Sequence, residues 1–198
     1  IPALLAVTIA ATVLSAYSGA SSAQGRAPVQ PLDFPHPVHV QKLGMNCLYC
    51  HYSANKAPDP GMPAVGTCMG CHTVIGPKRP AIAGNPARTS VGITKLVDYA
   101  NRKQPVPWIR IHKVPEYVRF PHMRHVKAGV TCQSCHGQVQ AMQRVSQFAS
   151  LNMGWCINCH VNGYQPAEGA RAAGYAPTPD QVAAPPRKAR YDCSSCHY

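Results

Sequence analysis

Residues 120–136 read Phe-Pro-His-Met-Arg-His-Val-Lys-Ala-Gly-Val-Thr-Cys-Gln-Ser-Cys-His, and this stretch decides the fold. Its last five residues form a C-x-x-C-H motif, which brings two thiols and one imidazole together within a short segment. His122 and His125, just upstream, are two further imidazoles with no cysteines of their own. Most of the remaining chain either repeats this arrangement or connects the copies.

All ten cysteines of the 198-residue chain fall in C-x-x-C-H motifs, at residues 47–51, 68–72, 132–136, 156–160 and 193–197, here called motifs one to five. Their thiols belong to Cys47, Cys50, Cys68, Cys71, Cys132, Cys135, Cys156, Cys159, Cys193 and Cys196. This motif is the attachment signal of c-type haem. Paired zinc ligands or disulfides would explain the thiols, but not the histidine that follows them every time. The sequence therefore predicts five covalently attached haem c groups.

The composition agrees with a chain that is built around cofactors. Aromatic residues make up 7% of the sequence, and it contains 20 Pro and 15 Gly, which is poor material for a protein-only core. Large apolar macrocycles would supply the missing buried surface. We expect a multihaem cytochrome c fold, mostly irregular coil with a few short α-helices wrapped around five haems, plus one N-terminal transmembrane helix.

The net charge of +12 would ordinarily indicate a nucleic-acid partner. The propionates of the predicted haems offset roughly half of this excess, since a bound cofactor's own charge belongs in the count. No recognition helix or basic–aromatic pattern is present either. The sequence therefore favours no nucleic-acid partner, and the basic residues are expected to contact propionates and redox proteins.

Residues 1–20 contain no charged side chain. A helix of that length spans about 30 Å, the thickness of a bilayer core. The small residues at 21 and 23 also fit a signal-peptidase site, which is the alternative interpretation. We expect residues 1–23 to be an uncleaved anchor in the cytoplasmic (inner) membrane, with the haem domain on the periplasmic side and with further residues preceding Ile1.

An internal repeat divides the rest of the chain. F-P-H-x-x-H-V occurs at residues 34–40 and again at 120–126, each time ahead of a haem motif. We expect a linker at 24–33, a dihaem module at 34–90 and a trihaem module at 91–198. Helices are predicted at about 91–102, where Ser90 is a good N-cap, and at about 139–148. The Ala-, Gly- and Pro-rich stretch 161–191 is expected to be a surface wrap.

The sequence contains enough histidines to fill both axial coordination positions of every haem iron. The proximal ligands are predicted to be the motif histidines His51, His72, His136, His160 and His197. The repeat supplies four distal ligands, His36, His39, His122 and His125. The fifth distal ligand is Met153 or, alternatively, His112, and Met ligation would raise the haem potential. With no open position on any iron, the chemistry indicated is electron transfer, and no catalytic residue is predicted.

The repeat resembles the modules of the class III multihaem cytochromes. In that family the first His of the pair ligates the nearby haem and the second reaches another. Pro107-Trp-Ile-Arg-Ile-His112-Lys-Val-Pro, the second F-P-H-x-x-H and Met153-Gly-Trp-Cys-Ile-Asn-Cys-His160 are also similar to the pentahaem cytochrome subunit of alternative complex III, over residues 34–198. That resemblance implies integral-membrane quinol-binding subunits and an iron–sulfur subunit as partners, and a monohaem cytochrome c or other soluble carrier as acceptor.

Three functions compete at this point. The favoured one is a membrane-anchored pentahaem electron-transfer subunit that relays electrons from a quinol-oxidising complex to a periplasmic carrier. The alternative is a self-contained small multihaem quinol dehydrogenase that feeds a soluble reductase. A multihaem reductase of small anions would need an open iron or a variant motif, and the sequence offers neither.

Overall fold

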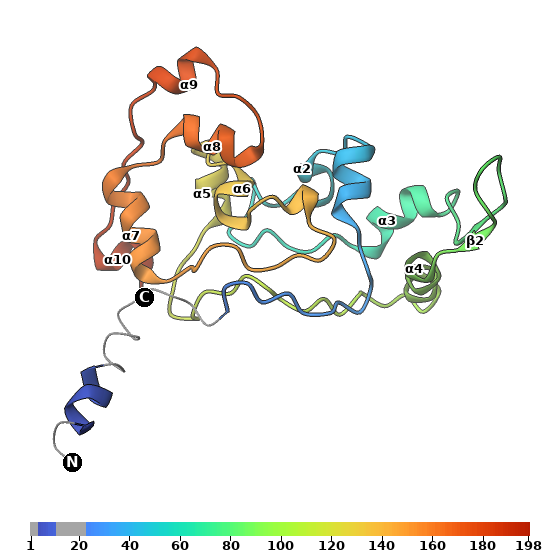
Figure 1. Ribbon diagram of the computed structural model, residues 1–198, viewed down its shortest axis with the longest axis horizontal. Coiled ribbons are helices and arrows are strands. Elements are labelled where there is room, and N and C mark those ends of the chain that lie inside the picture. The colour runs from blue at the N-terminus through green and yellow to red at the C-terminus, as the bar shows by residue number, and fades with distance from the viewer. Residues whose placement is uncertain (1–3, 11–22) are drawn as a thin grey trace.

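The computed structural model describes residues 4–10 and 23–198. Residues 4–10 are helical, and the other elements are short and separated by long irregular segments (Figure 1). In chain order these elements are η1 (Pro37–Lys42), α2 (Cys47–Cys50), α3 (Val65–His72), β1 (Lys78–Arg79), β2 (Arg88–Thr89), α4 (Val91–Asn101), α5 (His122–Lys127), α6 (Cys132–His136), η2 (Val139–Ala141), α7 (Met153–Asn162), α8 (Pro166–Ala173), α9 (Pro179–Ala183) and α10 (Cys193–Cys196). The coil-rich architecture that was predicted is therefore observed.

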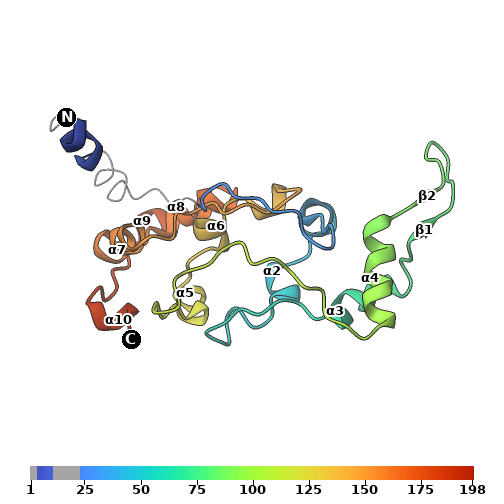
Figure 2. The same cartoon turned by 90° about the horizontal axis from the view of Figure 1, so that it is seen from below.

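The molecule is elongated, and the elements that carry the haem motifs are spread along its length. α3 and α4 lie at one end, α2 and α6 lie in the middle, and α7 and α10 lie at the other end in both cartoon views (Figures 1 and 2). α4 packs against α3, and α8 packs against α6. These local contacts hold each motif against its neighbours without a central sheet or bundle.

The protein's own core is small. Among the described residues, the buried apolar side chains are Leu32, Leu96, Ala149, Tyr164, Ala167 and Ala170. No side chain of the described residues is both large and fully buried. A chain of this size normally buries about two thirds of its surface around large apolar residues. The packing therefore leaves room for additional apolar groups.

The predicted helix over 91–102 is confirmed as α4. Ser90 caps it, because its Oγ accepts a hydrogen bond from Ile93 N at 3.3 Å. The predicted helix over 139–148 is wrong beyond its first turn, which is η2. The backbone of Gln147 instead pairs with residues 25 and 26: Gly25 N donates to Gln147 O at 2.7 Å, and Gln147 N donates to Arg26 O at 3.1 Å. This pairing between distant segments takes the place of the i to i−4 hydrogen bonds that a helix would have formed.

The segment 161–191 is more ordered than a surface wrap. It forms α8 and α9, and in α8 the side chain of Ala170 is fully buried. Small residues let α8 approach α6 closely, and Thr131 Oγ1 donates to Gly169 O at 3.1 Å. The alanines of this segment are evident in the sequence, but the close helix contact that they permit is not.

The predicted anchor, residues 1–23, lies largely outside the described residues. Within the part that is described, no helix has both the length and the apolar character needed to cross a bilayer. The predicted linker, residues 24–33, runs in contact with distant segments. Gln30 pairs with the backbone of Ile109, and Leu32 is buried.

Candidate functional site: paired imidazoles along a row of C-x-x-C-H motifs

The two copies of F-P-H-x-x-H fold in the same way. Phe34 stacks on His39 with ring centroids 4.3 Å apart and planes 23° apart, and Phe120 stacks on His125 at 4.4 Å and 28°. Each phenyl ring also meets the first histidine of its pair edge to face, at 4.8 Å for His36 and 4.9 Å for His122. One aromatic ring thus orients two imidazoles in each copy, and the repeated Phe is the only sign of this role in the sequence.

Three histidine pairs face each other at one characteristic distance. The ring centroids are 6.3 Å apart for His39 and His72, 6.2 Å for His122 and His136, and 6.1 Å for His125 and His160. Each pair joins one histidine of the F-P-H-x-x-H repeat to one motif histidine. A metal ion bonded at about 2 Å to one nitrogen of each ring would separate the centroids by about 6 Å.

His36, the other histidine of the first copy, interacts electrostatically with a motif histidine. Burial lowers the pKa of His36 to about 4, and the charges of His51 and His39 contribute to the shift. His51 is the motif-one histidine, so His36 lies near it as His122 lies near His136. His36 Nδ1 is buried without a hydrogen-bond partner among the described residues.

Backbone carbonyls fix the tautomers of four of these imidazoles. His39 Nδ1 lies 3.1 Å from Pro35 O and His125 Nδ1 lies 3.2 Å from Pro121 O, the same contact in both copies. His72 Nδ1 lies 2.9 Å from Ile75 O, and His160 Nδ1 contacts Arg190 O. Since a carbonyl only accepts, each Nδ1 must carry the hydrogen, which leaves Nε2 as the free lone pair for a metal.

Burial also favours the neutral form of three of the histidines that face each other, as ligation requires. It lowers the pKa of His136 to about 3, with smaller contributions from the charges of His112, His122 and His51. Burial lowers the pKa of His122 and of His125 as well. Neutral imidazoles with Nδ1 occupied and Nε2 free are suitable axial ligands for a haem iron.

The cysteines line the same space. A connected cavity of about 3400 Å³ is lined by all ten motif cysteines, by all five motif histidines and by the four histidines of the F-P-H-x-x-H repeat. Typical small-molecule pockets measure about 300–1,000 Å³, so this space suits several large groups. The described residues contain no cluster of three or more His, Cys, Asp or Glu that could hold one metal ion, which does not suit tetrahedral zinc. The residues present therefore fit covalently attached haem.

The thiols show the order of the motifs in space. Burial raises the pKa of Cys68, and the charge of Cys50 adds to it, so motifs two and one are adjacent. The side chain of Cys47 is the main cause of the raised pKa of Cys132, so motif one lies against motif three.

The series continues toward the C-terminus. Burial, with the charges of Cys159 and Cys156, raises the pKa of Cys135 to about 11, which places motif three beside motif four. Burial, with the charge of Cys196 next, raises the pKa of Cys156, which places motif four beside motif five. The order in space is two, one, three, four, five, in agreement with the positions of α3, α2, α6, α7 and α10 (Figure 1).

The two modules meet between motifs one and three. His122 N donates to Pro58 O at 3.0 Å, and Met123 N donates to Ala57 O at 3.3 Å. The second His pair is therefore bound by its backbone to the loop that follows motif one. The series of haem motifs therefore continues from the first module into the second.

Motif five is attached differently. Its backbone pairs with the segment before the second repeat, through the bridge between Val118 and His197 and the hydrogen bond from Arg119 N to Cys196 O at 2.7 Å. The ring of Tyr117 stacks on His197 with centroids 5.7 Å apart. This aromatic contact was not foreseen, because nothing in the local sequence links Tyr117 to a motif 80 residues away.

The two candidates for the fifth distal ligand occupy different places. His112 lies against the motif-three histidine, with 4.3 Å between the ring centroids of His112 and His136, too close for an iron between them. Its Nε2 is buried without a hydrogen-bond partner among the described residues. Met153 is exposed at the start of α7, one helical turn before Cys156, whose thiol interacts with Cys196 of motif five.

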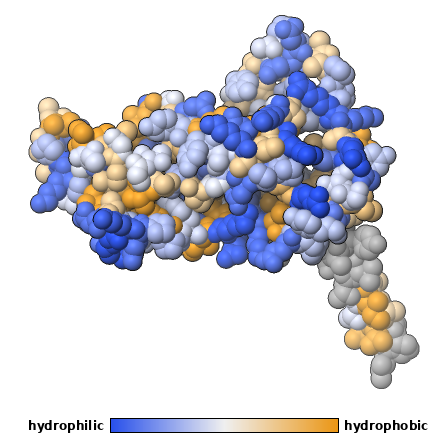
Figure 3. Space-filling model, turned by 180° about the vertical axis from the view of Figure 1, so that it is seen from behind, coloured by the Kyte–Doolittle hydropathy of each residue, from blue (hydrophilic) through white to orange (hydrophobic). Residues whose placement is uncertain are grey.

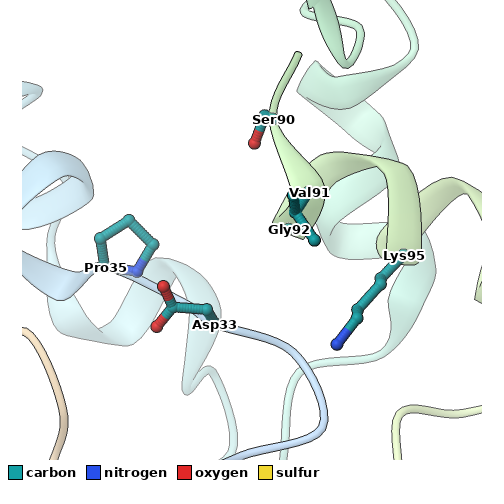
Figure 4. Close-up of a pocket in the computed structure, with 6 residues that line it drawn as sticks. All are labelled: Asp33, Pro35, Ser90, Val91, Gly92 and Lys95. Atoms are coloured by element: carbon teal, nitrogen blue, oxygen red, sulfur yellow. The ribbon is translucent and has the colours of Figure 1, made fainter.

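A second, small cavity of about 340 Å³ lies between the approach to the first His pair and the start of α4 (Figure 4). Asp33 and Pro35 line one side, and Ser90, Gly92 and Lys95 line the other. Lys95 Nζ donates to Pro31 O at 3.4 Å. No cysteine or histidine lines this cavity, so it belongs to the docking of residues 31–35 on α4 and not to the motif row.

Comparisons with known proteins agree with this site. Residues 124–198 match the family model of cytochrome c3. Over 133 residues the chain is 26% identical to the multihaem cytochrome c subunit of menaquinone reductase from Nitratidesulfovibrio vulgaris (strain Hildenborough), an alignment that covers 67% of this chain and 52% of the relative. The chain thus spans about half the length of that curated relative.

These findings and the geometry of the site support a multihaem c-type cytochrome. More narrowly, the part of the chain from α5 onward is similar to cytochrome c3. The comparisons do not bear on the resemblance to alternative complex III.

Proposed function

We propose that this chain is a membrane-anchored pentahaem cytochrome c that relays electrons from a quinol-oxidising membrane complex, of the alternative complex III type, to a periplasmic carrier. The observation that carries the proposal is the repeated pairing of a motif histidine with a histidine of F-P-H-x-x-H at 6.1–6.3 Å between ring centroids. Haem held between two imidazoles supplies one-electron exchange without an open coordination position.

The proposed ligand pairs follow the geometry. In the first module they are His36 with His51 and His39 with His72, and in the second they are His122 with His136 and His125 with His160. Met153 is proposed for motif five, since His112 already lies against His136. The chain's role is to hold these side chains apart at a fixed distance and to fix the tautomers of four of them through backbone carbonyls.

The row of motifs supports relay along the molecule. Cysteines of successive motifs lie close together from motif two to motif five, including across the boundary between the modules. Membrane partners are proposed from the relative, which is named as a subunit of a menaquinone reductase. Anchoring through residues 1–23, integral-membrane quinol-binding subunits, an iron–sulfur subunit and a monohaem cytochrome c as carrier are parts of the same proposal.

One observation favours a second candidate, in which electrons flow the opposite way. The relative is named for the reduction of menaquinone, and a chain of this class could deliver electrons to a membrane quinone from a periplasmic donor. Both candidates share the same ligand pairs and differ only in which end of the row is the donor side.

The purified native complex distinguishes the two directions. The oxidised complex is mixed with a quinol and the reduced α-band of the c-type haems is followed. The proposed function predicts reduction by quinol and reoxidation by an added oxidised monohaem cytochrome c. Reduction only by a periplasmic donor, with quinone as the acceptor, supports the second candidate. Quinol oxidation by the purified chain without partners supports the self-contained dehydrogenase.

A further inference from the structure

A hairpin projects from the end of the row at motif two. β1 and β2 pair antiparallel, with Lys78 opposite Thr89 and Arg79 opposite Arg88. All the residues of both strands are exposed, and Arg79 and Arg88 also line the margin of the large cavity. In both cartoon views the hairpin lies at the tip of the molecule, beyond α3 and α4 (Figures 1 and 2).

The hairpin is joined directly to motif two. His72 Nδ1 is hydrogen bonded to Ile75 O at 2.9 Å, three residues before β1 begins. At its base Ser90 N donates to Pro77 O at 2.8 Å, and Ser90 also caps α4, which packs on α3. A partner held by the hairpin would therefore lie close to the motif-two site, the terminal position of the row.

The hairpin combines apolar and basic surface. Ile82 at its tip is 68% exposed, and Val74 and Val91 at its base are 88% and 69% exposed. Residues 73–97 contain four basic side chains, Lys78, Arg79, Arg88 and Lys95, and no Asp or Glu. The space-filling view shows strongly polar and apolar residues side by side at this end of the molecule (Figure 3).

The opposite end of the row is less basic. Residues 179–198 carry Arg187, Lys188 and Arg190 against Asp180 and Asp192. Arg190 is also paired with Asp192 at 2.9 Å, whereas neither ion pair found in the described residues involves the hairpin. The motif-two end therefore carries a larger net positive charge than the motif-five end.

We propose that the 78–89 hairpin is the docking surface for an acidic face of a redox protein that exchanges electrons at the motif-two end of the row. The inference rests on the proposed relay function and assigns one of its two contact surfaces. Electron-transfer encounters use small interfaces steered by complementary charge, and isolated apolar side chains within a basic surface suit such an encounter. An anionic lipid surface is the competing occupant.

The test uses the holoprotein on a gold electrode coated with a carboxylate-terminated monolayer, which serves as the acidic probe. The variant carries Lys78→Glu, Arg79→Glu and Arg88→Glu. A matched variant carries Lys127→Glu, Arg171→Glu and Lys188→Glu, which changes the net charge equally at exposed positions away from the hairpin. Film voltammetry gives the bound amount and the interfacial electron-transfer rate, and the absorption spectrum of each variant checks that the haems are in place.

The proposal predicts that the hairpin variant loses at least about tenfold in electron-transfer rate at low ionic strength and the matched variant less than about threefold, with the difference fading in high salt. Equal losses in the two variants would show a net-charge effect only and would overturn it. Binding to vesicles of phosphatidylglycerol that depends on the hairpin, with unchanged electrode rates, would also overturn it in favour of a lipid surface. Haem ligation, read by spectroscopy on the same samples, tests the relay function separately.

Discussion

The ring of Phe120 stacks on His125 with 4.4 Å between their centroids and, at 4.9 Å, meets His122 edge to face. The same two contacts recur between Phe34 and its histidines, so each repeat uses one phenyl ring to hold two imidazoles that face different motifs. Neighbouring sites are therefore coupled mechanically through a single side chain.

Phe120→Leu should disturb both sites at once. Loss of the ring contacts removes about 0.5–1.5 kcal/mol of interaction energy and frees both imidazoles to rotate. We expect broadened low-spin signals from two haems in the electron paramagnetic resonance spectrum, with the others unchanged. Phe34→Leu is the equivalent change in the first module, and Tyr175→Leu, at a half-exposed ring, is the control. Broadening of only one haem signal would contradict the shared role.

His125→Ala should open one coordination position. The structure places His125 opposite His160, and the neighbouring His122 faces a different motif. We expect the reduced variant to bind carbon monoxide at one haem per chain, while the wild-type protein at full haem occupancy binds none. A carbon monoxide difference spectrum measures this. Wild-type binding of carbon monoxide would contradict closed coordination in general.

Met153 and His112 can be separated by the same spectrum. Met153→Leu should create one carbon monoxide site, because the thioether is proposed as the ligand of the motif-five iron. His112→Ala should create none, since its ring lies against His136 and not across an iron. The reverse outcome would transfer the fifth ligand to His112.

Gly169→Ala should destabilise the contact between α6 and α8. A Cβ at this position would lie 1.6 Å from Tyr164 Oη, and that hydroxyl accepts a hydrogen bond from Thr131 N at 3.1 Å. Overpacking of this kind costs roughly 1–3 kcal/mol, so the denaturant midpoint should fall. Gly66→Ala in α3 has open space around it and is the matched control, expected to be neutral or slightly stabilising. An equal fall in both variants would contradict the packing argument.

Asp192 should make the C-terminal motif sensitive to acid. Hydrogen bonds from Ser194, Ser195 and Arg190 hold the pKa of its carboxyl well below the ordinary 3.8. A depressed pKa contributes stability that is present above the unfolded value and is lost as the pH falls through the folded value. The midpoint difference between wild type and Asp192→Asn should therefore be constant above about pH 4 and shrink in stronger acid. Thermal unfolding at a series of pH values measures it, and a difference that grows in acid would contradict this account.

Short-range chemistry was predictable from the sequence and long-range packing was not. Ser90 caps α4 as expected, because a cap depends on residues three positions apart. The helix expected at 139–148 was wrong because Gln147 pairs with Gly25 and Arg26, more than 100 residues away. No local pattern indicates such a partner.

The same division holds for the site. The two F-P-H-x-x-H copies led to the histidines that the structure brings opposite the motif histidines. The order of the motifs in space could not be predicted from the sequence. Motif one lies between motifs two and three, although motif two separates them along the chain. The stacking of Tyr117 on His197 likewise arises only when the C-terminus returns to residues 117–119.

The central claim is that each haem iron is six-coordinate and is held between two side chains of this protein. Low-temperature electron paramagnetic resonance combined with a near-infrared scan of the charge-transfer bands tests it most directly on the purified oxidised holoprotein. The account predicts five low-spin haems, four with bis-histidine bands and one with a histidine–methionine band. A high-spin haem at full occupancy, or fewer than four bis-histidine haems, would contradict it.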